Sequence, residues 1–145
     1  KRKDEKWYIN TNITYSFGSG KVTGAYGDAT AKAHADTLYT AQDETDGLGT
    51  EGEVKSRGLK YNLIQNIKRQ AAAELQNTDW YVVRKADAGT AVPSAITTHR
   101  AAVRTKAAEQ ETAITNAADT PALETLYTRN EDGVRPLGDL PTLEI

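Results

Sequence analysis

Two helix-type apolar patterns, separated by a short segment containing Trp80, constrain the fold of this chain most. The first pattern covers residues 53–76, where apolar side chains recur at helical spacing on one face: Leu59, Leu63, Ile64, Ile67, Ala71 and Leu75. The second runs from Pro93 to about Ala117 and has a similar stripe, made of Ile96, Val103, Ala107 and Ile114. Two such helices can bury their stripes against each other. With a short helix starting at Thr120-Pro121, they predict a helical unit over residues 53–128.

The segment between the two patterns predicts a structural elbow. Trp80, Val82 and Val83 form an apolar patch too short for a helix of its own, and the propensities of residues 80–85 predict an extended segment. Trp80 is expected to be buried between the helices, beside Ile67, Ala71, Ile96 and Val103. Asp79 can accept hydrogen bonds from exposed amides, and Arg100 or Arg104 can stack on the Trp80 ring or pair with Asp79.

The N-terminal 52 residues predict a β-hairpin, a short helix and an acidic loop. Residues 6–17 alternate between apolar and polar, with Trp7, Ile9, Ile13, Tyr15 and Phe17 on one face, which is typical of a half-buried strand. Gly18-Ser19-Gly20 is a turn signal, after which residues 21–26 can return as a second strand. Asp28 is a suitable N-cap for a helix over residues 29–41, and residues 42–52 form a loop rich in glycine and acid.

The last segment, residues 129–145, predicts an extended arm. It is polar and interrupted by Gly133, Pro136, Gly138 and Pro141, yet it carries apolar anchor residues: Val134, Leu137, Leu140, Leu143 and Ile145. Such a segment gains order by lying in a groove. We expect that groove on a neighbouring chain, with docking on its own domain as the alternative. The fold class expected is α+β, mostly helical, in the segments 1–52, 53–128 and 129–145.

Charge is distributed in alternating blocks. The chain of 145 residues has a net charge of −2, but the net charge is +3 in residues 1–27, −6 in residues 28–53, +7 in residues 55–106 and −6 in residues 107–145. Blocks of opposite sign can attract one another within a chain or between chains. The near-neutral sum, and the scarcity of aromatic residues among the basic ones, argue against a dedicated nucleic-acid binder.

The candidate chemical motifs are incomplete. Gly18-Ser19-Gly20-Lys21 lacks the other residues of a phosphate-binding loop. Residues 42–53 place Glu44, Asp46 and Glu53 near calcium-loop positions, but Gln42 stands where aspartate is expected. His34 and His99 are the only histidines, and cysteine is absent. We therefore expect no enzymatic activity, no cofactor and no metal, and no apolar run is long enough to span a membrane.

The run IKRQAAAELQNTDW at residues 67–80 resembles a module of tailed-bacteriophage proteins. In that module an Arg-containing helix leads into Thr-Asp-Trp, and a second helix follows after a Pro-containing gap. Val92-Pro93, His99-Arg100 and Val103-Arg104 match its second half, so the resemblance covers residues 68–106. His99 stands where the module usually has an aromatic residue.

The resemblance implies a non-enzymatic structural component of a phage virion, an adaptor in the tail, baseplate or fibre attachment. The alternative it implies is a tail-fibre assembly chaperone that is not retained in the particle. The implied partners are other virion proteins and copies of the chain itself, and the implied location is the virion, assembled in the host cytoplasm.

Overall fold

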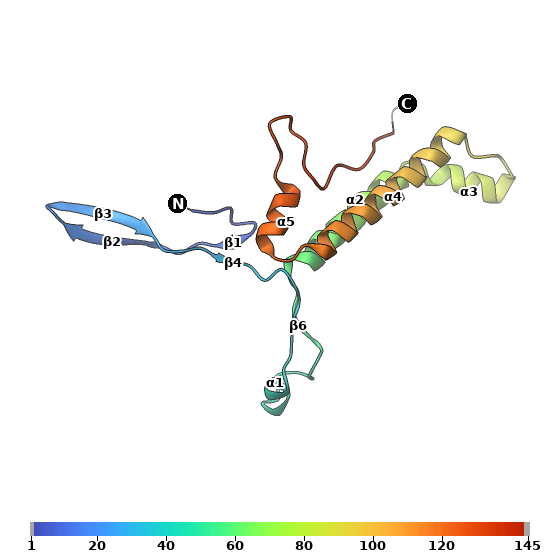
Figure 1. Ribbon diagram of the computed structural model, residues 1–145. Coiled ribbons are helices and arrows are strands. Elements are labelled where there is room, and N and C mark those ends of the chain that lie inside the picture. The colour runs from blue at the N-terminus through green and yellow to red at the C-terminus, as the bar shows by residue number, and fades with distance from the viewer. Residues whose placement is uncertain (1, 144–145) are drawn as a thin grey trace. The chain divides into compact units, whose positions relative to one another are not determined.

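The computed structural model describes residues 2–143 and has the predicted α+β fold, with β-hairpins followed by long helices (Figure 1). The chain divides into two compact units. The first comprises the residues up to Leu59 together with Ala118–Glu124, and the second comprises Lys60–Ala117 together with the residues from Thr125 onward. Each unit is described by itself.

The first unit contains three antiparallel two-stranded pairings. They are β1 (Tyr8–Ile9) with β4 (Thr30–Ala31), β2 (Ile13–Gly18) with β3 (Lys21–Tyr26), and β5 (Thr37–Leu38) with β6 (Val54–Ser56). The predicted hairpin is therefore confirmed, with its turn at Ser19 and Gly20. Both turn residues have positive φ, 52° and 71°, which is the type I′ geometry that suits the twist of a tight hairpin.

Residues 29–41 do not form the predicted helix. Residues 29–40 are not helical because several of their backbone groups bond to residues distant in sequence. Lys32 N donates to Trp7 O at 2.9 Å, and Ala33 O accepts from Leu59 N at 2.9 Å. The alanines in this segment favour a helix by only a few tenths of a kcal/mol per residue, so these tertiary bonds decide its conformation.

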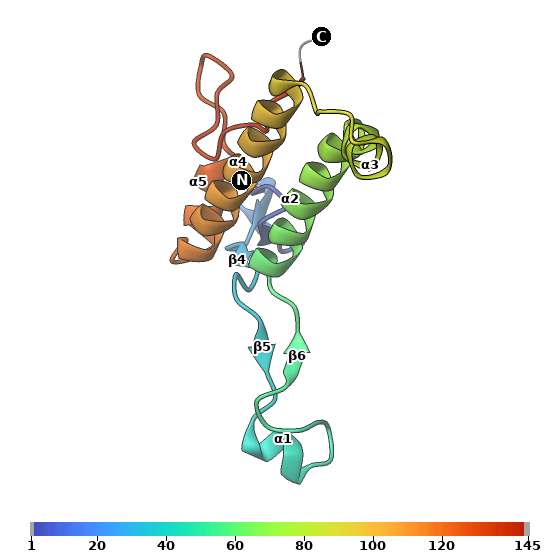
Figure 2. The ribbon, with the colours of Figure 1, turned by 90° about the vertical axis from the view of Figure 1, so that its right-hand side faces the viewer.

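The acidic loop contains a short helix, α1 (Ala41–Thr45), at the end of the β5–β6 pair (Figure 2). A capping box starts the helix, with Asp43 N donating to Thr40 Oγ1 at 3.2 Å and Thr40 N donating to Asp43 Oδ2 at 2.9 Å. Lys55 Nζ, on β6 (Val54–Ser56), lies 2.6 Å from Asp43 Oδ1. The hydrogen bond from Lys55, followed by those from the Thr40 amide and hydroxyl, lowers the pKa of Asp43 to about 2.

The first long helix, α2 (Leu59–Gln76), begins six residues later than predicted. Gly58, which lies inside the range predicted for this helix, instead precedes it in a close backbone contact. A Cβ at this position would lie 2.2 Å from Ala35 O. Gly58 N also donates to Asp36 Oδ1 at 2.8 Å, and this bond, with that from Arg57, lowers the pKa of Asp36.

The helices α2 and α4 (Ser94–Asn116) pack together side by side (Figure 2). They are antiparallel, because Lys60 Nζ donates to Thr115 O at 2.9 Å near one end while Arg100 Nη1 donates to Leu75 O at 2.8 Å near the other. The predicted stripes supply much of the buried core: Leu63, Ile67 and Ala71 from α2, and Ile96, Val103, Ala107 and Ile114 from α4.

Two further helices complete the elements. The segment 80–85 is not extended, because Asp79–Ala88 forms helix α3, which ends at Gly89 with φ 68°. Thr120–Tyr127 forms the predicted short helix, α5, on which Leu123 is fully buried and Leu126 and Tyr127 are partly buried.

Candidate interaction surfaces

Arg100 is the centre of the elbow between α2 and α3. Its buried guanidinium donates through Nη1 to Leu75 O at 2.8 Å and to Thr78 Oγ1 at 2.7 Å, and Nη2 lies 2.8 Å from Asp79 Oδ1. The last carbonyls of a helix lack intrahelical donors, and Leu75 O near the end of α2 accepts from Arg100, from Thr78 N at 3.0 Å and from Thr78 Oγ1 at 3.0 Å. The expected pairing of Asp79 with an arginine of the second long helix is therefore present, through Arg100.

Trp80 contradicts the prediction of a buried ring, because 51% of the residue is exposed. The reason is the helical conformation of α3, which has no buried residue at all. The ring lies beside Tyr81, with centroids 3.8 Å apart, and the Arg84 guanidinium lies over the Trp80 ring at 4.7 Å. Val82 and Val83 are exposed on the same helix, so α3 presents an apolar and aromatic surface.

Arg104 does not share the role of Arg100. Its Nη1 lies 3.5 Å from Arg100 O, and among residues 2–143 no ion pair joins it to an acidic side chain. The cation over Trp80 is Arg84, which the sequence did not single out. A spacing of four residues, Trp80 to Arg84, is the signal that would have indicated this pair once α3 was known to be helical.

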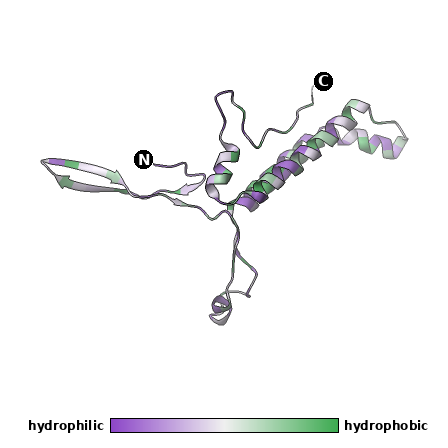
Figure 3. Ribbon diagram, viewed as in Figure 1, coloured by the Kyte–Doolittle hydropathy of each residue, from purple (hydrophilic) through white to green (hydrophobic). Residues whose placement is uncertain are grey.

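The β2–β3 hairpin carries an exposed apolar surface on one side. Cross-strand partners in an antiparallel pair face the same side, and the register joins Ile13 to Tyr26, Tyr15 to Gly24 and Phe17 to Val22. The hairpin face, as we call it, consists of Ile13, Tyr15, Phe17, Val22 and Tyr26. All five residues are exposed, Phe17 to 78%, and Figure 3 shows the hydrophobic positions along this hairpin. The single half-buried strand predicted over residues 6–17 is instead divided between β1 and β2. Its first part is buried at Trp7 and Tyr8, whereas β2 is exposed on both faces.

The C-terminal arm is held in part by its own chain. Leu137 is only 3% exposed, and its amide donates to Leu126 O at 3.0 Å. Gln110 Nε2 on α4 donates to Gly138 O at 2.9 Å. The position of Leu137 thus follows the alternative, docking within the chain, and not the expected docking on a neighbouring chain.

The other anchor residues of the arm differ from Leu137. Val134 is exposed, while Leu140 and Leu143 are partly buried. Ile145 lies outside the described residues.

The two histidines have different surroundings. His99 is buried on α4, with Nε2 3.2 Å from Glu74 Oε1 on α2, whereas His34 lies partly buried in the extended segment between β4 and β5. Across residues 2–143, no group of three or more histidine, aspartate or glutamate side chains is placed to hold a metal ion.

Across the same residues, no helix combines the length and the apolar character that crossing a membrane requires. Comparison of the chain with protein-family models, with curated proteins and with solved structures gave no match.

Proposed function

We propose that this chain is a non-enzymatic structural component of a tailed-phage virion, acting as an adaptor in the tail, baseplate or fibre attachment. The observation that carries the proposal is the hairpin face. Five apolar side chains stand exposed on a two-stranded ribbon, and an isolated ribbon of this kind is only marginally stable in water. Such a surface is typical of a segment that becomes ordered and covered against another protein.

The resemblance around Thr78-Asp79-Trp80 supports the phage assignment. Arg100, which occupies the arginine position of the second helix in the module, contacts both Thr78 and Asp79. These residues therefore act together as one structural cluster. The exposure of Trp80 adds a second surface, on α3, that a neighbouring virion protein can cover.

The alternative is a tail-fibre assembly chaperone, which would use the same surfaces during assembly and then leave. Mass spectrometry of purified particles from the phage that encodes the chain separates the two functions. We expect the chain in the particles at a fixed ratio to the tail proteins. Presence in infected cells, absence from particles and defective fibres without the chain would establish the chaperone instead. Particles that neither contain nor require it would refute both.

The hairpin face gives a sharper test in the same system. We expect Tyr15→Ser with Phe17→Ser to lower incorporation of the chain into particles, because both side chains belong to this face. Thr14→Ala with Ser16→Ala is the matched control, since these residues lie on the opposite face of β2. Equal incorporation of both variants would exclude the hairpin face as the attachment surface.

A further inference from the structure

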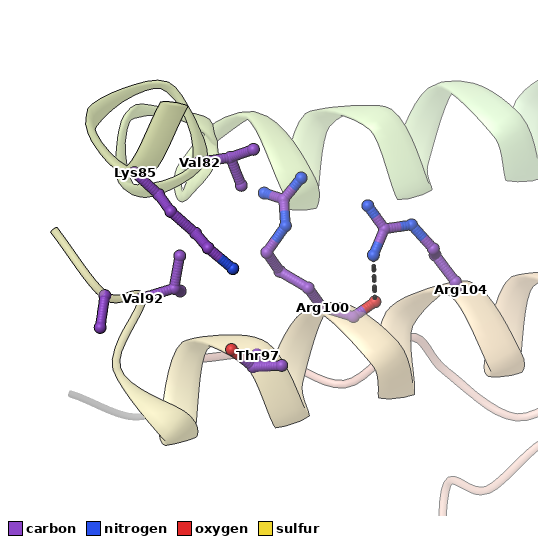
Figure 4. A pocket seen from close by; sticks show the side chains of 7 residues that line it. Val82, Lys85, Val92, Thr97, Arg100 and Arg104 are labelled. Carbon is purple, nitrogen blue, oxygen red and sulfur yellow. Dashed lines mark hydrogen bonds between the residues drawn. The ribbon is translucent and has the colours of Figure 1, made fainter. Parts of the chain in front are cut away.

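The second unit contains a pocket with an apolar wall and a cationic rim. Val82, Ala91 and Val92 supply the apolar side chains, and Lys85, Arg100 and Arg104 supply the cations, around a volume of about 350 Å³. Figure 4 shows the Lys85 amine between Val92 and Arg100, with Arg104 one turn further along α4. The volume is within the range of pockets that bind small ligands or single side chains.

Two of the three cations are available to a ligand. Arg100 is engaged with Leu75, Thr78 and Asp79. Lys85 and Arg104 are exposed, and neither has an acidic partner among the residues from 2 to 143. A pocket that combines two free cations with an apolar wall fits an apolar side chain flanked by carboxylates.

A nucleic acid fits this pocket less well than an acidic peptide does. Binding to a phosphate backbone uses a row or groove of cations, often with stacking aromatic residues. Here the cations surround a hollow lined by two valines and an alanine, and Asp79 and Asp87 lie on the same helix as Lys85. The chemistry therefore points to a protein segment.

The chain itself displays a segment of the required chemistry at the end of the β5–β6 pair. Leu48 is 59% exposed, and its amide donates to Asp43 O at 2.8 Å, which fixes it on the turn after α1. Glu44, Asp46 and Glu51 surround it in sequence, and across the described residues no cation pairs with any of them. We call residues 43–51 the acidic tip. Its apolar residue and unpaired carboxylates complement the pocket.

We propose that the acidic tip of one copy of this chain docks into the pocket of a second copy. Leu48 enters between Val82 and Val92, while the carboxylates of the tip face Lys85 and Arg104. Because the tip and the pocket are different surfaces, the contact is head-to-tail, and repetition generates a ring or a filament. The contact concerns copies of the chain and does not depend on a phage origin.

Cysteine cross-linking tests the contact directly, because the native chain has no cysteine. Full-length Leu48→Cys is mixed under oxidising conditions with a differently tagged full-length Val92→Cys. We expect a disulfide-linked heterodimer on a non-reducing gel. The matched control replaces Val92→Cys by Thr112→Cys, an exposed position on α4 outside the pocket, and should give no heterodimer. Equal cross-linking of both pairs would overturn the proposal.

A chain carrying both Leu48→Cys and Val92→Cys distinguishes contact between copies from contact within one copy. We expect linked multimers. Only internally linked monomers would show that the tip folds onto its own pocket, and the proposal would be wrong.

Charge reversal tests the electrostatic part by sedimentation. Lys85→Glu with Arg104→Glu, and separately Glu44→Lys with Asp46→Lys, should each weaken self-association about tenfold or more. Mixing the two variants should restore association, because each reversed tip then meets a reversed pocket. Lys68→Glu with Arg69→Glu, on α2, is the control and should leave association unchanged. Circular dichroism verifies folding. A wild-type chain that stays monomeric, or reversals without effect, would refute the contact.

Discussion

Arg100 is the residue on which the order of the elbow most depends. A buried guanidinium is stable only where hydrogen bonds and a counter-charge replace water, and here Leu75, Thr78 and Asp79 provide them. In return, Arg100 holds the end of α2 against the start of α3. The Asp79 side chain is largely exposed, so the backbone carbonyl and the buried Thr78 hydroxyl contribute more to this arrangement than the ion pair.

Replacing Arg100 by methionine should therefore destabilise the second unit. Arg100→Met keeps an unbranched apolar stem but removes the guanidinium, which leaves the buried Thr78 hydroxyl and Leu75 carbonyl without their charged donor. We expect the free energy of unfolding to fall by about 2–4 kcal/mol, measured by urea denaturation followed by circular dichroism. Arg104→Met, one turn along the same helix and exposed, is the control, with a change within about 0.5 kcal/mol. Equal effects would contradict the assigned role of Arg100.

The Asp43 carboxyl should titrate far below an ordinary aspartate. Its pKa is lowered from 3.8 to about 2, first by the Lys55 hydrogen bond and then by the Thr40 amide and hydroxyl. A lowered pKa means that the folded form favours the ionised carboxylate. The stabilisation of α1 is thus fully present above pH 3.8 and is lost as the pH falls toward 2. Carbon-13 NMR of the carboxyl measures the pKa directly.

The control for this titration is Lys55→Met, which removes the first cause of the shift. We expect the pKa of Asp43 to rise toward 3.8, while the hydrogen bonds from Thr40 keep it below that value. An unchanged pKa in this variant would show that Lys55 does not contact Asp43 in solution.

At the scale of elements, the sequence correctly predicted the helices and strands whose apolar residues recur at a regular spacing. The apolar stripes of α2 and α4 are buried as expected, and the β2–β3 turn lies at Ser19 and Gly20. Both features were predictable because residues close in sequence determine them. The prediction is wrong where hydrogen bonds to backbone groups distant in sequence determine the conformation. Residues 29–40 are kept out of a helix by bonds to Trp7 and Leu59, which no local pattern encodes.

The segment 80–85 shows a second kind of error. Its short apolar run predicts an extended segment, but α3 also includes residue 79 before it and residues 86–88 after it, and Trp80, Val82 and Val83 stay exposed. Burial of Trp80 is predicted from its position between the two apolar stripes, but it lies on α3, which has no buried residue. The predicted burial of the hairpin face is wrong for a related reason. Alternation of apolar and polar residues shows that one side of a strand is apolar, but not whether another element covers that side.

A substitution of Gly58 tests the close contact between Gly58 and the Ala35 backbone just before α2. In Gly58→Ala the added Cβ would lie 2.2 Å from the backbone oxygen of Ala35, so one of the two segments must move. We expect the free energy of unfolding to fall by about 1–3 kcal/mol in thermal or urea melts. Gly18→Ala is the matched control, because its Cβ would meet no atom within 4 Å and its φ is not in the left-handed region. A tolerated Gly58→Ala would place the Ala35 backbone elsewhere.

At the scale of the whole molecule, the buried core is small and much apolar surface remains outside it. Valines of α3, aromatic residues of β2 and β3, and Leu48 at the acidic tip are all exposed. Each lies in a segment with few buried residues of its own, whereas α2 and α4 carry much of the buried core. Such exposed apolar segments suit a chain that becomes ordered against partners, as the proposed adaptor and head-to-tail contact both require.

A substitution in the C-terminal arm tests whether Leu137 stabilises its own chain or a contact with a neighbouring chain. Leu137 is buried and bonded to Leu126, so Leu137→Ala should lower the free energy of unfolding by about 2–4 kcal/mol and leave the oligomeric state unchanged. Val134→Ala, at an exposed position of the same arm, should change it by less than about 0.5 kcal/mol. Urea denaturation and light scattering measure the two quantities. If Leu137→Ala instead left unfolding unchanged and dissociated the assembly, Leu137 would belong to a groove on a neighbouring chain.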